Sequence, residues 1–232
     1  MNDSEILRTY FLLKENELII AVIKMNSSEA VFSKKLIFEK TNTDYLSKEV
    51  EIFFLKNIEE IEKVTKSFVK DIFLVLGDEN IFSVNFSLKK KIKNKIITDG
   101  ELKSLLTNGL QQIYKSYPDF SIIHFVINQF NIDGQTYYSL KDKLVNDFFW
   151  VELKFICIEN NSVNKFKELF KKKEIHLKKI FSEKYVKQFN SENKDIIKTA
   201  IEIENGLNQL EVKLVPKKLE KKGFFENFFL SF

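Results

Sequence analysis

Few side chains in this sequence could do catalytic or metal-binding chemistry, and they lie far apart. Histidine occurs only at His124 and His176, and cysteine only at Cys157. A zinc site usually takes three or four Cys, His or carboxylate ligands at recognisable spacings, and these residues supply no such set. The sequence also lacks the Gly-x-Ser-x-Gly motif of a serine nucleophile. We therefore predict no catalytic residue, no metal site and no enzymatic activity.

The surroundings of these residues favour structural roles. Cys157 has apolar neighbours, whereas a reactive thiol needs a base and an accessible, electropositive setting, so we expect a core residue. His124 precedes an apolar run and is expected at the edge of a strand, and His176 is expected to face solvent. Asp133 and Gly134 place a carboxylate beside a permissive backbone, but a turn of type I′ is the better interpretation.

The composition limits the classes of partner. The 232 residues suit one or two domains, and 44% apolar with 30% charged residues is typical of globular proteins. The net charge is only +4, and Arg8 is the one arginine among 37 basic residues. Nucleic-acid binders usually have a stronger basic footprint and use arginine forks, so we expect no nucleic-acid partner. The lysine run at 89–91, with Lys93 and Lys95, is expected to be a solvated arm of a hairpin.

Nothing in the sequence indicates export or a membrane span. One cysteine cannot form an intrachain disulfide, which fits a reducing compartment. Residues 1–9 carry charges before any apolar run, unlike a signal peptide. No stretch approaches the roughly 20 apolar residues that cross a bilayer. We expect a cytoplasmic protein, which is compatible with a peripheral position on a membrane.

Hydrophobic periodicity predicts an α+β fold. The first part of the chain predicts a three-stranded meander, a helix and a strand: 10–13, 18–24, 30–39, 58–69 and 72–76. The middle predicts one sheet with two helices, in the order strand, helix, strand, strand, helix, strand: 82–88, 98–113, 122–127, 150–158, 163–172 and 175–180. Thr98 and Glu101 form a capping box for the first of these helices, and residues 160–162 are expected to cap the second. A helix at 195–203 and a strand at 210–215 follow.

Several segments of the middle region resemble the actin-like cell-division protein FtsA. Residues 76–85 resemble a stretch in which a Gly-centred turn leads into a strand. Residues 97–102 resemble the family's Ile-Thr-x-x-Asp-Val helix start, with Glu101 in place of Asp. Residues 124–135 resemble its His-x-Ile-Pro-x-x-Tyr-x-x-Asp segment, and 149–153 continue the pattern. The resemblance implies an SHS2, or 1C-type, subdomain at 81–182 after a reduced 1A-like subdomain at 1–80. A C-terminal segment at 183–215 and a basic linker with an amphipathic tail at 216–232 complete the division.

The departures from this family concern its ATP site. Family members hold the phosphates with two Gly-containing loops, the first reading Asp-x-Gly-x-Thr/Ser. Here the first turn is Lys14, Glu15, Asn16 and Glu17, with no glycine and two added carboxylates. The second loop is missing, because only two glycines follow Gly134. We therefore expect no ATP binding and no cofactor. About 50 residues follow the 1C-like unit, too few for the two remaining subdomains, which puts FtsZ binding in doubt.

The C-terminal tail has the composition of a membrane anchor. Its five phenylalanines recur at helical spacing and form one stripe on a helix, and four lysines precede them. Apolar insertion together with roughly 1 kcal/mol per lysine at an anionic surface would make a reversible anchor. The alternative is that the phenylalanines pack on the core or on a neighbouring molecule. The predicted membrane-binding residues are Lys217, Lys218, Lys221, Lys222, Phe224, Phe225, Phe228, Phe229 and Phe232.

The resemblance implies a non-catalytic interaction module of bacterial cell division, tethered to the inner membrane face. Its 1C-like unit would contact division proteins or other copies of the chain, with Asn131, Asp133, Gly134 and Gln135 as the expected partner-binding residues. An alternative keeps the fold and changes the process. Pilus proteins similar to PilM and the L proteins of type II secretion use related actin-like scaffolds that bind a peptide of a membrane partner.

Overall fold

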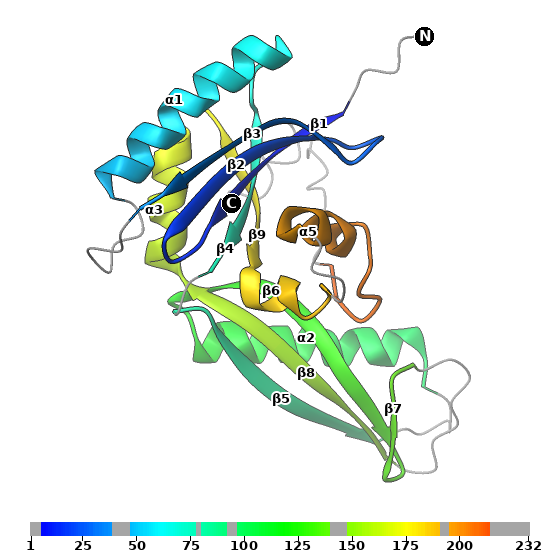
Figure 1. The fold of residues 1–232 in the computed structure, drawn as a ribbon. Coiled ribbons are helices and arrows are strands. Elements are labelled where there is room, and N and C mark those ends of the chain that lie inside the picture. The colour runs from blue at the N-terminus through cyan, green and yellow to red at the C-terminus, as the bar shows by residue number, and fades with distance from the viewer. Residues whose placement is uncertain are drawn as a thin grey trace, which may run out of the picture.

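The computed structural model describes residues 6–38, 47–77, 80–91, 97–139, 148–190 and 195–213, and these form an α+β fold with two sheets and five helices (Figure 1). The predicted fold class is thus confirmed. The predicted linker and tail at 216–232, with Lys93 and Lys95, lie outside the described residues.

The first sheet has five strands in the order β3-β2-β1-β4-β9. The meander β1 (Leu7–Leu13), β2 (Glu17–Lys24) and β3 (Glu29–Ile37) is antiparallel, as predicted. Strand β4 (Asp71–Leu76) pairs parallel with β1, and β9 (His176–Ser182) pairs parallel with β4. The carboxyl ends of β1, β4 and β9 therefore meet at one edge of this sheet.

Helices cover both faces of the first sheet (Figure 1). On one face, α1 (Lys48–Thr65) and α3 (Asn160–Lys171) enclose a core centred on the rings of Phe11, Phe54 and Phe170. On the other, α4 (Glu183–Lys187) and α5 (Ile196–Glu204) pack on alternate residues of the same strands. Burial on both faces explains why the inner strands β1, β2 and β4 are continuous apolar runs rather than alternating ones.

Helix α1 begins about ten residues earlier than the periodicity at 58–69 predicted. Val50 and Phe54 continue its buried stripe towards the N-terminus, and Ser47 caps it by accepting the Val50 N–H at 3.3 Å. The helix ends at Lys66, which adopts the left-handed conformation with φ 51°. The segment after Lys66 is therefore loop, not helix.

The second sheet is antiparallel, with β5 (Phe82–Lys91), β8 (Phe148–Glu159), β6 (Phe120–Ile132) and β7 (Gln135–Tyr137) in that order. Helix α2 (Asp99–Ser116) covers one of its faces. The capping box of α2 is confirmed, because the Thr98 hydroxyl accepts the Glu101 N–H and the Glu101 carboxylate accepts the Thr98 N–H.

Three predicted elements need correction. The strand expected at 175–180 as part of the second sheet is β9, which pairs with β4 in the first sheet, and α3 packs in the core of the first sheet. The apolar pattern of a strand does not tell which strand it pairs with. A prediction from sequence order alone therefore placed β9 and α3 with the wrong sheet. Helix α3 follows Glu159 without a side-chain cap, and Asn160 instead bonds to Ser121 and to the Pro118 carbonyl. At 210–215, the described part forms only a single bridge, between Glu211 and Val126.

Candidate functional site

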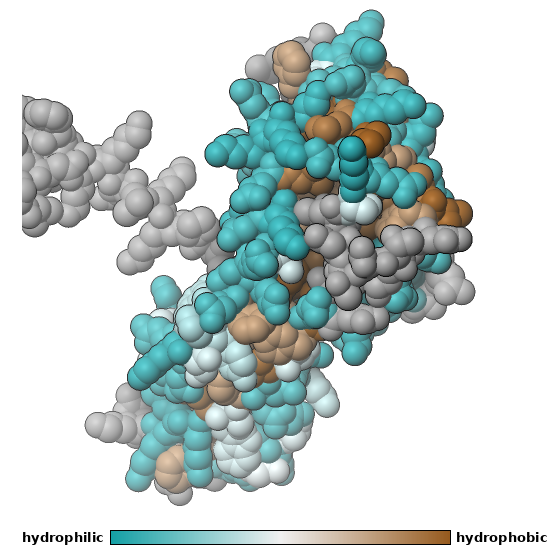
Figure 2. All heavy atoms as spheres, turned by 90° about the vertical axis from the view of Figure 1, so that its left-hand side faces the viewer, coloured by the Kyte–Doolittle hydropathy of each residue, from teal (hydrophilic) through white to brown (hydrophobic). Residues whose placement is uncertain are grey.

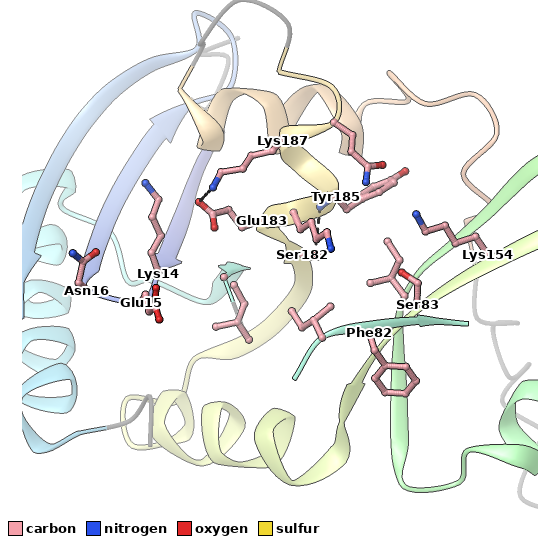
Figure 3. Close-up of a pocket in the computed structure, with 16 residues that line it drawn as sticks. Lys14, Glu15, Asn16, Phe82, Ser83, Lys154, Ser182, Glu183, Tyr185 and Lys187 are labelled. Atoms are coloured by element: carbon pink, nitrogen blue, oxygen red, sulfur yellow. Dashed lines mark hydrogen bonds and ion pairs between the residues drawn. The ribbon is translucent and has the colours of Figure 1, made fainter. Parts of the chain in front are cut away.

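A cleft of about 800 Å³ lies between the two sheets (Figure 3). Its walls are the β1–β2 turn, the carboxyl ends of β4 and β9, helix α4 and the near ends of β5 and β8. In α/β sheets, ligands usually bind in a crevice outside the carboxyl ends of the parallel strands. We take this cleft as the candidate site.

The β1–β2 turn, at residues 14–17, borders this cleft. The Lys14 N–H donates to the Glu17 carbonyl at 2.8 Å, which leaves Glu15 and Asn16 exposed at the tip (Figure 3). The Glu17 carboxylate pairs with Lys35 at 2.9 Å and with Lys14 at 3.3 Å. The hydrogen bond from Lys35 lowers the pKa of Glu17, with a smaller contribution from Lys14 and against the effect of burial. The turn is thus closed on itself by its own charged groups.

A buried carboxylate fills the space next to this turn. Glu183 is 8% exposed and forms an ion pair with Lys187 at 3.0 Å (Figure 3). A Cβ atom on Gly77 would lie 2.7 Å from the Glu183 Oε2 atom, so the close approach depends on glycine at this position. The Gly77 N–H is not free, because it donates to the Leu13 carbonyl at 2.8 Å.

His124 lies at the back of the cleft wall, not at a strand edge as predicted. It is 2% exposed and joins the two sheets: its Nε2 atom accepts the Ser182 N–H at 3.1 Å, and its Nδ1 atom lies 2.9 Å from the Glu211 Oε1 atom. An Nε2 atom that accepts from an amide cannot carry a proton, so the proton is on Nδ1 and His124 is neutral. Burial lowers the pKa of His124 below its ordinary 6.5, and the bond to Glu211 offsets this only in part.

Glu211 is the centre of the remaining bonds. Its Oε2 atom accepts the Tyr185 hydroxyl at 3.1 Å, and the Lys179 ammonium lies 3.8 Å from Oε1. Tyr185 in turn accepts from the Asn208 amide at 2.8 Å. Burial acts to raise the pKa of Glu211, but the donated bonds and Lys179 together lower it. Sequence reasoning missed this network because His124 and Glu211 are 87 residues apart.

The predicted partner-binding residues lie elsewhere, in the β6–β7 turn at the end of the second sheet away from the first (Figure 1). Asp133 and Gly134 have φ values of 50° and 87°, the two positive angles that a type I′ turn requires. The Gly134 N–H donates to the Asn131 side chain at 3.0 Å. The predicted turn is confirmed, and its role in binding stays a prediction.

The other residues singled out for potential chemistry are Cys157 and His176. Cys157 is fully buried, as predicted, and burial raises its pKa to about 11. His176 is exposed, as predicted. In the part of the chain that the structure describes, no group of His, Cys, Asp or Glu could hold a metal ion. Within the same residues, none of the helices combines the length and the apolar character that crossing a bilayer requires.

No protein-family model and no curated protein matches this chain. Among solved structures, it is similar to the cytoplasmic domain of EpsL, an inner-membrane component of the type II secretion system of Vibrio cholerae, with 13% identity, 79% of this chain and 59% of that one covered, and a TM-score of 0.38. It is also similar to the PilM–PilN type IV pilus biogenesis complex, with 8% identity, 78% and 48% coverage, and a TM-score of 0.48.

A third similar structure is a Bacteroides thetaiotaomicron protein with an actin-like ATPase fold and unknown function. Its identity is 12%, its coverage 82% of this chain and 59% of that one, and its TM-score 0.28. The chain thus spans 48% to 59% of the length of these three proteins.

Proposed function

We propose that this chain is a non-catalytic protein-interaction module, related to FtsA, which works in bacterial cell division on the inner face of the membrane without binding ATP. The observation that carries the proposal is the state of the backbone amides around the cleft. The choice of cell division as the process rests on the resemblance of the middle of the chain to FtsA.

A phosphate cradle needs several free backbone N–H groups that point at one anion. Around this cleft the amides of Lys14, Gly77, Ser182 and Tyr185 already donate, to the Glu17 carbonyl, the Leu13 carbonyl, the His124 ring and the Ser182 hydroxyl respectively. Two of the four lysines that line the cleft are paired with glutamates, Lys14 with Glu17 and Lys187 with Glu183. A triphosphate would have to compete with these bonds and with the carboxylates.

The lining suits part of a protein better than a nucleotide. Charges of both signs border the cleft, because Lys154, Lys184 and Glu15 all line it. Phe82 and Ile156 add apolar surface to the lining. Such a surface can bind the backbone and mixed side chains of a short peptide. In this proposal the cleft and the β6–β7 turn are docking surfaces, and the predicted tail is the membrane anchor.

Titration calorimetry with Mg-ATP tests the absence of a nucleotide site. We expect no saturable heat for the full chain. A matched variant, Glu15→Gly with Glu183→Gln, removes the two carboxylates, and we expect it to remain without binding because the amides stay occupied. Micromolar affinity of the natural chain for Mg-ATP would overturn this account of the cleft.

A second candidate function is a scaffold similar to PilM or to the type II secretion L proteins, which binds a peptide of a membrane partner. The mixed-charge cleft favours it as much as the first function. A pull-down from cells discriminates between the two, with the full chain beside a Lys154→Glu, Lys184→Glu variant. Division proteins lost in the variant support the first function. Pilus or secretion components lost in the variant support the second.

A further inference from the structure

A second groove, of about 360 Å³, lies at the opposite edge of the first sheet, at the amino ends of β1 and β4. Val22, Ile61 and Phe73 line it, and Ile6 and Phe68 stand at its rim, 59% and 82% exposed. Two large apolar side chains that border one groove and remain in water form the kind of surface that binds another apolar segment.

Local hydrogen bonds fix the segment that carries Phe68. Helix α1 ends at the left-handed Lys66, and the Thr65 hydroxyl accepts the Ser67 hydroxyl at 3.1 Å. The Val69 N–H donates to the Glu62 side chain at 3.2 Å. Phe68 lies between these two bonds, so its exposure follows from the backbone path. A preorganised aromatic residue at a rim loses little entropy when a partner covers it.

The charged side chains that line the groove do not favour a strongly charged ligand. The Arg8 guanidinium lies 3.3 Å from the Glu204 carboxylate, and its Cζ atom lies 5.1 Å from the centre of the Phe73 ring. Arg8 is the only arginine of the chain, and this pair largely neutralises it. Asp71 and Lys178 also line the groove and lie 3.9 Å apart, and Lys70 adds one positive charge. The apolar floor and rim therefore favour a mostly apolar segment that carries little charge.

The path of the chain identifies the occupant. The last described residue is Lys213, and its ammonium donates to the Glu204 carbonyl at 2.6 Å, next to the groove wall. Residue 224 follows eleven residues later, and eleven residues can span up to about 36 Å, so reach is no obstacle. Residues 224–232 include five phenylalanines and one charged side chain. We propose that phenylalanine side chains of residues 224–232 occupy this groove whenever the protein is away from a membrane.

The proposal rests on the proposed function, because the same tail is the predicted anchor. A short tether gives a tail an effective concentration of roughly 1 mM at a nearby site. A groove with an intrinsic Kd of about 0.1 mM would then be filled about 90% of the time and would lower the apparent membrane affinity about tenfold. The groove would thus keep the tail out of water and release it only to a sufficiently anionic surface.

Disulfide trapping in the full chain tests the contact directly. The substitutions Phe68→Cys and Phe228→Cys are combined in one variant, and their two thiols are oxidised under mild conditions. The buried Cys157 does not compete. The control pairs Phe228→Cys with Tyr138→Cys, an exposed residue of the second sheet's loop region. We expect an intramolecular disulfide in the first pair and none in the control. A disulfide between two molecules, or equal trapping in both pairs, overturns the proposal, as does the absence of any disulfide.

A vesicle assay separates this proposal from the anchor itself. With vesicles of equal parts phosphatidylcholine and phosphatidylserine, Phe68→Ser should bind up to about tenfold more tightly than the natural chain, and Tyr138→Ser should bind equally. Equal binding of all three overturns the groove proposal and leaves the anchor intact. If none of the three binds while the disulfide between positions 68 and 228 of the double variant still forms, the predicted anchor is wrong and the groove proposal stands.

Discussion

The imidazole of His124, from the second sheet, accepts the backbone N–H of Ser182, from the last strand of the first sheet, at 3.1 Å. This bond lies in the buried layer where the two sheets meet, and Glu211 fixes the ring from its other side. We expect His124→Ala to lower the free energy of unfolding by about 3 kcal/mol, because it leaves an amide and a carboxylate buried without their partner. Urea denaturation measures the change. The control His176→Ala, on an exposed residue, should stay within about 0.5 kcal/mol of the natural chain.

The same histidine predicts how stability depends on pH. Its folded pKa lies below the ordinary 6.5, so the unfolded chain binds a proton more readily than the folded one. The contribution of the neutral His124 to the free energy of unfolding is therefore fully present above about pH 6.5 and is lost as the pH falls below that value. Glu211, with a pKa below the ordinary 4.5, adds a second loss in more acidic solution. Thermal melting between pH 8 and 5 should show this decline, and His124→Asn should flatten it. A melting temperature that rises on acidification would contradict the assignment of a neutral ring.

Gly77 and Glu183 should be energetically coupled. A Cβ at Gly77 would meet the terminal oxygen of the Glu183 side chain, which can shift, so Gly77→Ala should cost about 0.5–1 kcal/mol. In the double variant with Glu183→Ala the added methyl has room, so most of the cost of Gly77→Ala should vanish. A double-mutant cycle by urea denaturation measures the coupling. Simple additivity of the two changes would show that the carboxylate does not occupy this space.

Gly109 permits the close contact of α2 with its sheet. An alanine methyl there would overlap the side chain of Leu153 and crowd Leu88. We expect Gly109→Ala to destabilise the protein by about 1–3 kcal/mol, although alanine favours helix by up to about 1 kcal/mol. Gly100→Ala is the matched control, because its Cβ would meet only the Thr98 hydroxyl, at 3.9 Å. If both variants were equally stable, α2 would not pack as closely as described.

Deleting residues 224–232 should abolish co-sedimentation with anionic vesicles. The reason is that the predicted anchor combines five phenylalanines with the lysines before them, and removal of the apolar part leaves only weak surface attraction. A matched variant keeps the length of the chain and changes the five phenylalanines to serine, and it should behave like the deletion. Unchanged sedimentation of both variants would remove the anchor from the proposed function.

Local signals in the sequence predicted the elements that local interactions determine. The capping box at Thr98 and Glu101 fixed the start of α2, and the Asp133–Gly134 pair fixed the β6–β7 turn, because each depends on residues within one turn of the chain. The partner of β9 and the network around Glu211 were not predictable in this way. Both depend on contacts between distant segments, for which a single sequence carries no periodic signal.

The cleft, too, was predictable from the sequence only where local residues determine it. The glycine-free turn at residues 14–17 was visible in the sequence, and it does border the cleft. That Glu183 lies beside Gly77 could not be read from a sequence in which they stand more than a hundred residues apart. Phe68 lies within the predicted helix at 58–69, because apolar periodicity cannot reveal that the helix ends two residues earlier at a left-handed lysine.

At the junction between the sheets, strand β5 begins next to the point where β8 ends, since Phe82 lies opposite Cys157. The whole second sheet with α2 is therefore an insertion whose two covalent attachments are neighbours. Closing such a gap by a short loop costs little chain entropy. A different unit could take its place only if it kept the contacts with the first sheet, which include the buried side chains of Val126 and Ile156 and the bond from Ser182 to His124.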